Sequence, residues 1–189
     1  MATEARSRII SSAIALGRRN GLANLAIADI LADSGTARRS LYTHFPRGVA
    51  DVAVEATKDA AALLGQLFDV GARMEPRAGL AMFVEGWKAW LESDGFSLGC
   101  PIVSAAMAKN SLPEAAAIAE DAFVDWESKI HANLLEHGVP EDKARSLAMF
   151  MVSSVEGATF RCMSSSSAEP LLATQKHLEE LLDLHLPAK

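Results

Sequence analysis

Apolar residues recur at helical spacing along almost the whole chain, and glycine or proline interrupts the pattern between segments. Stripes at i, i+3 and i+4 spacing run through residues 4–19, 27–34, 37–43, 49–70, 76–91, 101–107, 113–137, 140–163 and 170–185. No segment shows the period-two alternation of a half-buried strand. The sequence therefore predicts an all-α fold of about nine helices.

Composition supports a folded chain and narrows its class. Half of the 189 residues are apolar and the mean hydropathy is +0.13, which suffices for a core and argues against disorder. Cys100 and Cys162 cannot build a disulfide framework, and no signal-peptide pattern is seen at the N-terminus, so we expect free thiols and a cytoplasmic protein. No uncharged apolar run reaches the ~18 residues of a membrane span. The histidines and cysteines lack zinc-ligand spacing, so we expect neither metal nor cofactor.

Charge is distributed unevenly along the chain. Residues 1–48 carry seven arginines and three acids, a net charge of +4, whereas residues 49–189 carry 11 bases and 21 acids, a net charge of −10. Such asymmetry points to a basic module that meets an anion, joined to an acidic body that does not. Arginine suits bidentate contacts to phosphate and guanine. The alternative is a basic surface that is merely solvated.

Residues 27–45 combine a short apolar helix, a glycine turn and a second short helix with arginines at its start. That is the helix-turn-helix pattern, whose second helix must be short and polar on its outer face to enter the major groove. Leu41 and Phe45, four residues apart, are expected to anchor this helix to a core. Arg38, Arg39, Tyr42 and Thr43 then face outward, and Gly35 allows the tight turn between the helices.

Further positions fall in register with this motif. They are Arg8-Ile9-Ile10, Ala13, Gly21, Ile27-Ala28-Asp29-Ile30, Gly35 and the run Leu41-Tyr42-Thr43-His44-Phe45. On these positions, residues 6–52 resemble the TetR family of bacterial repressors. Residues 45–48, 99–102 and Glu156-Gly157 resemble its LmrA/YxaF branch. The resemblance implies a helix-turn-helix DNA-binding domain over residues 1–48 and a helical ligand-binding and dimerisation domain over residues 49–189.

The resemblance also suggests which residues meet DNA. Tyr42 and His44 are expected to donate to phosphate oxygens, and Ser40 stands where the family often has a phosphate-binding threonine. The start of the recognition helix usually meets base edges. Val49 replaces a phosphate-contacting lysine of the family, so Arg47 is expected to take over that contact. The predicted DNA-binding set is Arg38, Arg39, Ser40, Tyr42, Thr43, His44 and Arg47.

Aromatic residues in two of the later helices predict a ligand pocket. Their helical spacing fits either a plain core or the lining of a cavity, and an adaptable methionine side chain would suit the cavity. The predicted pocket set is Phe83, Trp87, Met107, Phe123, Trp126 and Ile130.

The last two helices carry more apolar surface than one side of a helix needs. A second copy of the chain, packed through a four-helix arrangement, would cover the surplus, although a better-buried monomer core is the alternative. The predicted dimer set is Val152, Glu156, Phe160, Leu171, Leu178 and Leu182.

Taken with the resemblance, these features predict a ligand-responsive transcriptional repressor. We expect a homodimer that binds a palindromic double-stranded DNA operator and is released by a small, largely apolar organic effector. No nucleophile–base–orienter set appears in the sequence, so we expect no enzyme. The alternative is a helical small-molecule-binding protein or enzyme that no longer binds DNA.

Overall fold

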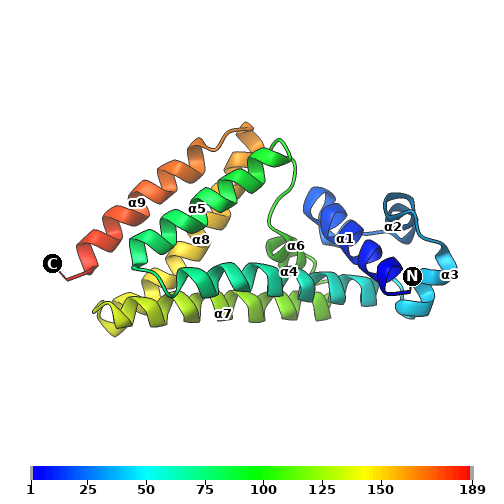
Figure 1. Ribbon diagram of the computed structural model, residues 1–189, viewed down its shortest axis with the longest axis horizontal. Coiled ribbons are helices and arrows are strands. Elements are labelled where there is room, and N and C mark those ends of the chain that lie inside the picture. Colours follow the sequence, from blue (N-terminus) through cyan, green and yellow to red (C-terminus); the bar gives the residue numbers. More distant parts are fainter. Residues whose placement is uncertain (1, 188–189) are drawn as a thin grey trace. The chain divides into compact units, whose positions relative to one another are not determined.

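The structure is a computed structural model that describes the backbone of residues 2–187 and the side chains of residues 4–187 (Figure 1). Within that range the chain is all-α, with no strand, as the sequence predicts. No helix of the described range is long and apolar enough to cross a membrane. The elements are α1 (Ala2–Asn20), η1 (Leu22–Asn24), α2 (Ile27–Ser34), α3 (Arg38–His44), α4 (Val49–Gly71), α5 (Pro76–Ser93), α6 (Pro101–Met107), α7 (Pro113–Glu136), α8 (Glu141–Ser165) and α9 (Glu169–His185).

Proline and glycine set several of these helix ends. Pro76 and Pro101 occupy the first turns of α5 and α6, where the missing amide proton would have no intrahelical partner. Gly35 ends α2 in the left-handed conformation with φ 63°, and its amide donates to the carbonyl of Leu31. The helix boundaries predicted from the sequence agree with those of the structure to within about two residues.

The chain divides into two compact units. The first holds the residues up to Leu63 together with Cys100–Ala122, and the second holds Leu64–Gly99 together with the residues from Phe123 onward. Both α4 and α7 contribute residues to each unit. The bounds of these units differ from those of the predicted domains 1–48 and 49–189, which stay a prediction; α6, for example, packs against α1 and η1 within the first unit.

A small apolar core holds the first unit together. It draws buried side chains from α1, α2, α3 and α4 and from the residue directly after α3: Ile9, Ile10, Ala13, Ile30, Leu41, Phe45, Val52 and Ala56. At the edge of this core Arg6 of α1 forms an ion pair with Glu55 of α4, and the guanidinium also lies over the ring of Phe45. These contacts tie α1, α4 and the end of α3 into one body.

In the second unit, α9 lies beside α5 and α8 (Figure 1). Leu171, Leu178 and Leu182 on α9 are each at most 1% exposed within this single chain. They belong to the core of the protomer, so their predicted place in a dimer interface is wrong. Helical spacing identified them as buried, but it could not distinguish burial against α5 and α8 from burial against a second copy.

Two glycines of α5 test how closely this helix approaches the end of α4, because only one of them has a close neighbour. A Cβ at Gly79 would lie 2.8 Å from the carbonyl oxygen of Gly71, whereas nothing lies within 4 Å of a Cβ at Gly86. We expect Gly79→Ala to destabilise the protein by roughly 1–3 kcal/mol through this clash. Gly86→Ala should stabilise it by roughly 0.5–1 kcal/mol, because alanine loses less backbone entropy in a helix.

Urea denaturation of both variants beside the wild-type protein measures these changes. Equal effects of the two substitutions would contradict the close approach of Gly79 to Gly71.

Candidate DNA-binding surface and ligand cavity

The turn between α2 and α3 is built from small residues. Gly35 adopts its left-handed conformation with open space around it, and the hydroxyls of buried Ser34 and Thr36 form a 2.7 Å hydrogen bond across it. A hydrogen bond inside the turn limits the conformations of the segment before α3. The start of α3 is therefore held in a defined direction.

Two buried side chains fix α3 against the core of the first unit. Leu41 and Phe45 are at most 1% exposed, as the motif predicts. Arg38, Arg39, Tyr42 and Thr43 are exposed. The remaining predicted residues of this helix, Ser40 and His44, are half-buried. One face of α3 is thus held by the core, and the other presents arginines and hydroxyls.

The turn after α3 places the ring of Tyr42. Gly48 has φ 64°, and a Cβ at this position would lie 3.5 Å from the Tyr42 ring and 3.6 Å from Ile27. Both distances are ordinary van der Waals contacts, so the positive φ, and not a lack of space, is what favours glycine here. The phenol of Tyr42 remains exposed beside the start of α4.

Arg47 differs from the other predicted DNA-contacting residues, because its charge is already engaged within the first unit. Its Nε donates to Asp51 at 2.6 Å, and its two terminal nitrogens donate to the two carboxylate oxygens of Glu114 at 2.7 and 2.9 Å. The backbone amide of Arg47 donates to Asp51 as well. A phosphate contact by Arg47 would require this arrangement to open, a cost that the sequence did not reveal.

The same contacts shift the titration of the acids. Hydrogen bonds from the Arg47 amide and guanidinium lower the pKa of Asp51, and the guanidinium hydrogen bonds lower the pKa of Glu114. The pKa of Arg47 is raised in turn, first by Glu114. Arg47 and Glu114 are exposed and Asp51 is half-buried, so salt screens above all the attraction between Arg47 and Glu114.

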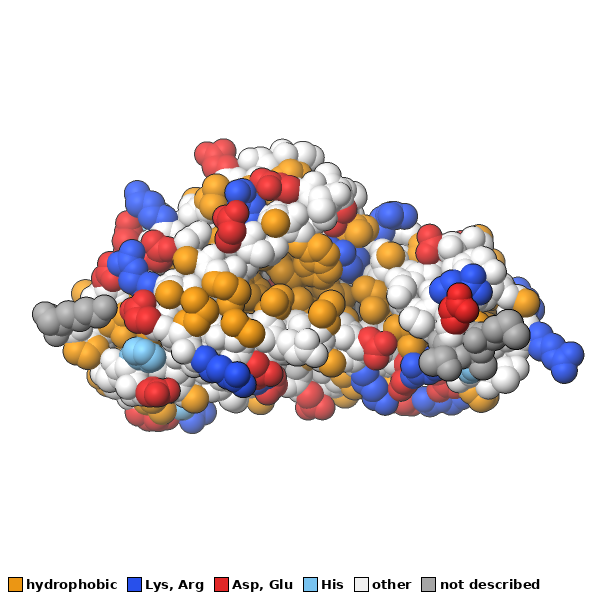
Figure 2. Space-filling model, viewed as in Figure 1, with side chains coloured by type: hydrophobic (Ala, Val, Ile, Leu, Met, Phe, Trp, Pro, Cys, Tyr) orange, Lys and Arg blue, Asp and Glu red, His pale blue; other side chains and the backbone are white. Residues whose placement is uncertain are grey.

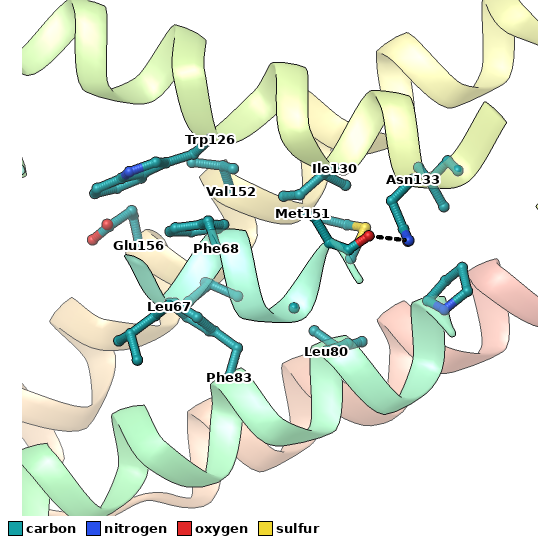
Figure 3. A pocket seen from close by; sticks show the side chains of 16 residues that line it. Leu67, Phe68, Leu80, Phe83, Trp126, Ile130, Asn133, Met151, Val152 and Glu156 are labelled. Carbon is teal, nitrogen blue, oxygen red and sulfur yellow. Dashed lines mark hydrogen bonds between the residues drawn. The ribbon is translucent and has the colours of Figure 1, made fainter. Parts of the chain in front are cut away.

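The second unit contains an apolar cavity of about 70 Å³ among α4, α5, α7 and α8 (Figure 3). Hydrophobic side chains gather between α5 and the C-terminal part of α4 (Figure 2). The lining is mainly carbon: Leu67, Phe68, Gly71, Ala72, Pro76, Gly79, Leu80, Phe83, Trp126, Ile130, Asn133, Leu134, Met151, Val152, Val155 and Glu156. A carbon-rich hollow with a few polar groups is the usual form of a small-molecule site.

A row of three aromatic rings borders this cavity, with one pair stacked and the other tilted by 39°. Phe68 lies 4.7 Å from Trp126 at an interplanar angle of 14°, measured between ring centroids, and 4.9 Å from Phe83. Phe83, Trp126 and Ile130 line the cavity, in agreement with the predicted pocket set. These three residues border a cavity, and that this cavity binds a ligand stays a prediction.

The other three members of that set lie elsewhere. Trp87 is buried in the core and donates its indole N–H to Thr159 Oγ1 at 2.8 Å, and Phe123 packs edge-on against Trp126 without lining the cavity. Met107 belongs to the first unit and its side chain is 74% exposed, so its predicted place in the pocket is wrong. Periodicity gives the direction of a side chain on its own helix, not the unit to which that helix belongs.

Sequence reasoning missed the contributions of α4 and α8 to the cavity. Phe68, the central ring of the row, follows Leu67 in the long fourth helix, where an aromatic residue could have been noted. Val152 and Glu156 line the cavity although both were predicted at the dimer interface. Asn133 of α7 donates to the carbonyl of Ala72 at 2.9 Å (Figure 3) and to that of Met74 at 3.0 Å, so it holds the segment at the end of α4.

The outer face of α8 is exposed and partly apolar. Phe150, Ser153, Gly157, Phe160 and Ser164 follow one another at steps of three and four residues, and all are exposed in the single chain. Phe160, with 49% of its surface exposed, is the one member of the predicted dimer set on this face. Large rings thus alternate with small residues along one side of the helix.

These features define the class of protein as a helix-turn-helix DNA-binding regulator. The family model described as "Transcriptional regulator LmrA/YxaF-like, C-terminal domain" matches residues 76–177, more than half of the chain. The protein therefore belongs to the LmrA/YxaF-like group of TetR-family transcriptional regulators.

Relatives and solved structures agree with this assignment over nearly the full length. An uncharacterised HTH-type transcriptional regulator of Mycobacterium tuberculosis is 28% identical, over 97% of each chain. The HTH-type transcriptional regulator LmrA of Bacillus subtilis is 23% identical, over 95% of this chain and 97% of its own. The crystal structure of a TetR transcriptional regulator from Chloroflexus aurantiacus superimposes with a TM-score of 0.82 at 25% identity, covering 98% of this chain and 97% of its own.

The contacts of Arg47 predict an acid-dependent contribution to stability. Because Arg47 lowers the pKa of Glu114, folding gains from the charged carboxylate above its ordinary pKa of 4.5 and loses this gain as the pH falls through the lowered folded value. We expect Glu114→Gln to be less stable than the wild-type protein at pH 7, and we expect this difference to shrink as the pH falls below 4.5. Urea denaturation across this range measures the difference.

Arg47→Gln serves as the matched control, since Glu114→Gln in that background should have little further effect at neutral or acid pH. A stability difference between wild type and Glu114→Gln that stays constant from pH 7 to pH 3 would contradict the pairing.

Proposed function

We propose that the protein is a ligand-responsive transcriptional repressor that binds a palindromic operator as a homodimer and is released by a small, largely apolar organic effector. The observation that carries the proposal is the division of α3 into a core face, held by Leu41 and Phe45, and an exposed face with Arg38, Arg39 and Tyr42. An exposed arginine pair on a short, rigidly anchored helix suits the major groove of DNA. The family membership supports the same role.

Within this surface the residues take different parts. Arg38 and Arg39 begin α3, the end of a recognition helix that approaches base edges, whereas Tyr42 and His44 stand near its end and suit phosphate oxygens. Ser40 and Thr43 add hydroxyl groups, although Thr43 also donates to the carbonyl of Arg39 at 2.8 Å. Arg47 joins the interface only if its pairing with Glu114 opens.

Arg38→Ala and Tyr42→Phe are expected to affect DNA binding in different ways. Loss of a guanine-reading arginine costs roughly 1–3 kcal/mol on the operator and relaxes the preference at one base pair of each half-site. Loss of a phosphate contact weakens binding to all sequences by a similar factor. Fluorescence anisotropy with DNA from upstream of the protein's own gene, and with a random duplex of equal length, separates the two effects.

If both variants lose affinity equally on operator and random DNA, Arg38 does not read a base. If the wild-type protein binds neither duplex, even at low salt where phosphate contacts are strongest, the DNA-binding function is refuted.

The cavity of the second unit supports the effector part of the proposal. Leu67 and Phe68 line it from α4, and the same helix begins at Val49, directly after the recognition segment. A ligand that prefers a changed position of α4 must lower DNA affinity, and by linkage DNA must lower ligand affinity in the same ratio. A coupling of about 1–3 kcal/mol corresponds to a loss of affinity of about 5–150-fold.

The exposed face of α8 supports the homodimer. Ser153 and Gly157 are small enough for a facing helix to approach closely, and Phe150 and Phe160 supply apolar area on either side. One recognition helix reads few base pairs, so specificity needs two half-sites about one DNA turn, ~34–36 Å, apart. Two copies related by a two-fold axis would provide them.

Phe160→Glu is expected to shift the protein from dimer to monomer, because it places a charge on the apolar face that the second copy would bury. Ala89→Glu, at an exposed position of α5, is the control and should leave the dimer intact. Light scattering at micromolar concentration reads the mass of each variant. A wild-type protein that is monomeric and still binds the operator at full affinity would refute the dimer.

A further inference from the structure

Building on the proposed function, we infer that Arg47 exchanges the carboxylate of Glu114 for a phosphate group when the protein binds DNA, while Asp51 keeps the guanidinium in place. The inference gives opposite roles to two acids that pair with the same arginine. Glu114 competes with DNA and limits the affinity, whereas Asp51 positions Arg47 for the phosphate. All three residues belong to the first unit.

The two acids hold different atoms of Arg47. The Nε donates to Asp51 Oδ1 at 2.6 Å, and the backbone amide donates to Oδ2 of the same carboxylate at 2.8 Å. The two terminal nitrogens instead donate to the two oxygens of Glu114, at 2.7 and 2.9 Å. Asp51 therefore fixes the guanidinium to its own backbone, and Glu114 occupies the terminal nitrogens.

The pairing with Glu114 has the form that a phosphate contact takes. Two parallel N–H···O bonds from the end of an arginine suit a carboxylate and a phosphate alike. Glu114 thus stands where a phosphate group would bind, and the two anions exclude each other.

Arg47 lies next to the proposed DNA-binding surface. It follows the end of α3 by three residues, and a Cβ on the next residue, Gly48, would lie 3.5 Å from the ring of Tyr42. The side chain of Arg47 is 55% exposed and that of Glu114 is 61% exposed. Ion pairs of such exposure are weak, so a phosphate displaces the carboxylate at small cost.

Two further contacts limit the cost of the exchange. The side chain of Asp51 is only 20% exposed, and its hydrogen bonds to Arg47 involve none of the atoms that leave Glu114. The turn after α3 therefore keeps its internal hydrogen bonds during the exchange. Lys58 also favours the charged form of Glu114, after the larger effect of Arg47, so the released carboxylate still has a cation nearby.

Glu114→Gln and Asp51→Asn each remove one negative charge from a partner of Arg47, so they separate the two roles. We expect Glu114→Gln to bind operator and random DNA about two- to tenfold more tightly, because Arg47 then reaches a phosphate without breaking an ion pair. Asp51→Asn should bind both about two- to fivefold more weakly, because the guanidinium is no longer oriented. Fluorescence anisotropy with the two duplexes described above measures both changes.

The salt dependence of binding gives a second readout. In the wild-type protein the exchange leaves Glu114 without Arg47, so a cation that collects at Glu114 partly offsets the counterions released from DNA. In Glu114→Gln this offset is missing. Between about 50 and 200 mM salt, we expect the slope of log affinity against log salt to be steeper by up to about one per protomer. A pairing that only stabilises the fold leaves this slope unchanged.

Glu120→Gln is the control for charge alone, because Glu120 is exposed on the same helix and is not a partner of Arg47 within the described residues. It should leave the salt slope unchanged and raise the affinity less than Glu114→Gln does. In an Arg47→Gln background, Glu114→Gln should gain no more than this control. If Asp51→Asn fails to fold, the comparison of Glu114→Gln with Glu120→Gln still decides.

Several results would overturn the exchange while the wild-type protein still binds DNA. These are a gain in Glu114→Gln no larger than in Glu120→Gln, an unchanged salt slope, a gain that survives without Arg47, or tighter binding by Asp51→Asn. Each of them leaves the DNA-binding function standing. If the wild-type protein binds neither duplex, the proposed function fails, and the exchange fails with it.

Discussion

Burial of Leu41 and Phe45 in the core of the first unit is the contact on which the DNA-binding surface depends. A helix of seven residues is too short to be stable alone. α3 is stable because Leu41 and Phe45 pack against buried side chains of α1, α2 and α4. The same contact fixes the rotation of α3 about its axis. Arg38, Arg39 and Tyr42 are exposed because the opposite face of α3, which carries Leu41, packs against the core.

Arg47 shows that acidic residues of the segment 49–189 can pair with a basic residue of the segment 1–48. The first 48 residues carry a net positive charge, yet one of their arginines is held by Asp51 and by Glu114 at the start of α7. Counting charges along the sequence treats Arg47 as equivalent to Arg38 and Arg39. Within the first unit it serves instead to hold the turn after α3 to α4 and α7, and any role on phosphate competes with that pairing.

The cavity arises from local features of the second unit. The absence of a side chain at Gly79 lets α5 approach the carbonyl of Gly71, and the large rings of Phe68, Phe83 and Trp126 pack along one border. Rigid rings that pack on one another cannot also collapse into the remaining space. A small apolar hollow remains, with the carboxylate of Glu156 in its lining.

The sequence by itself determined the helices, the recognition segment and its two anchors, because helical periodicity and turn residues act over a few positions. It also placed Phe83, Trp126 and Ile130 in the pocket. Only the tertiary structure decided the partners of each buried face. Leu171 and Leu182 meet helices of their own chain, Met107 points to solvent, and Val152 lines a cavity. A stripe of apolar residues specifies that a face must be covered, but the covering surface comes from residues far away in the chain, and no short-range pattern encodes that choice.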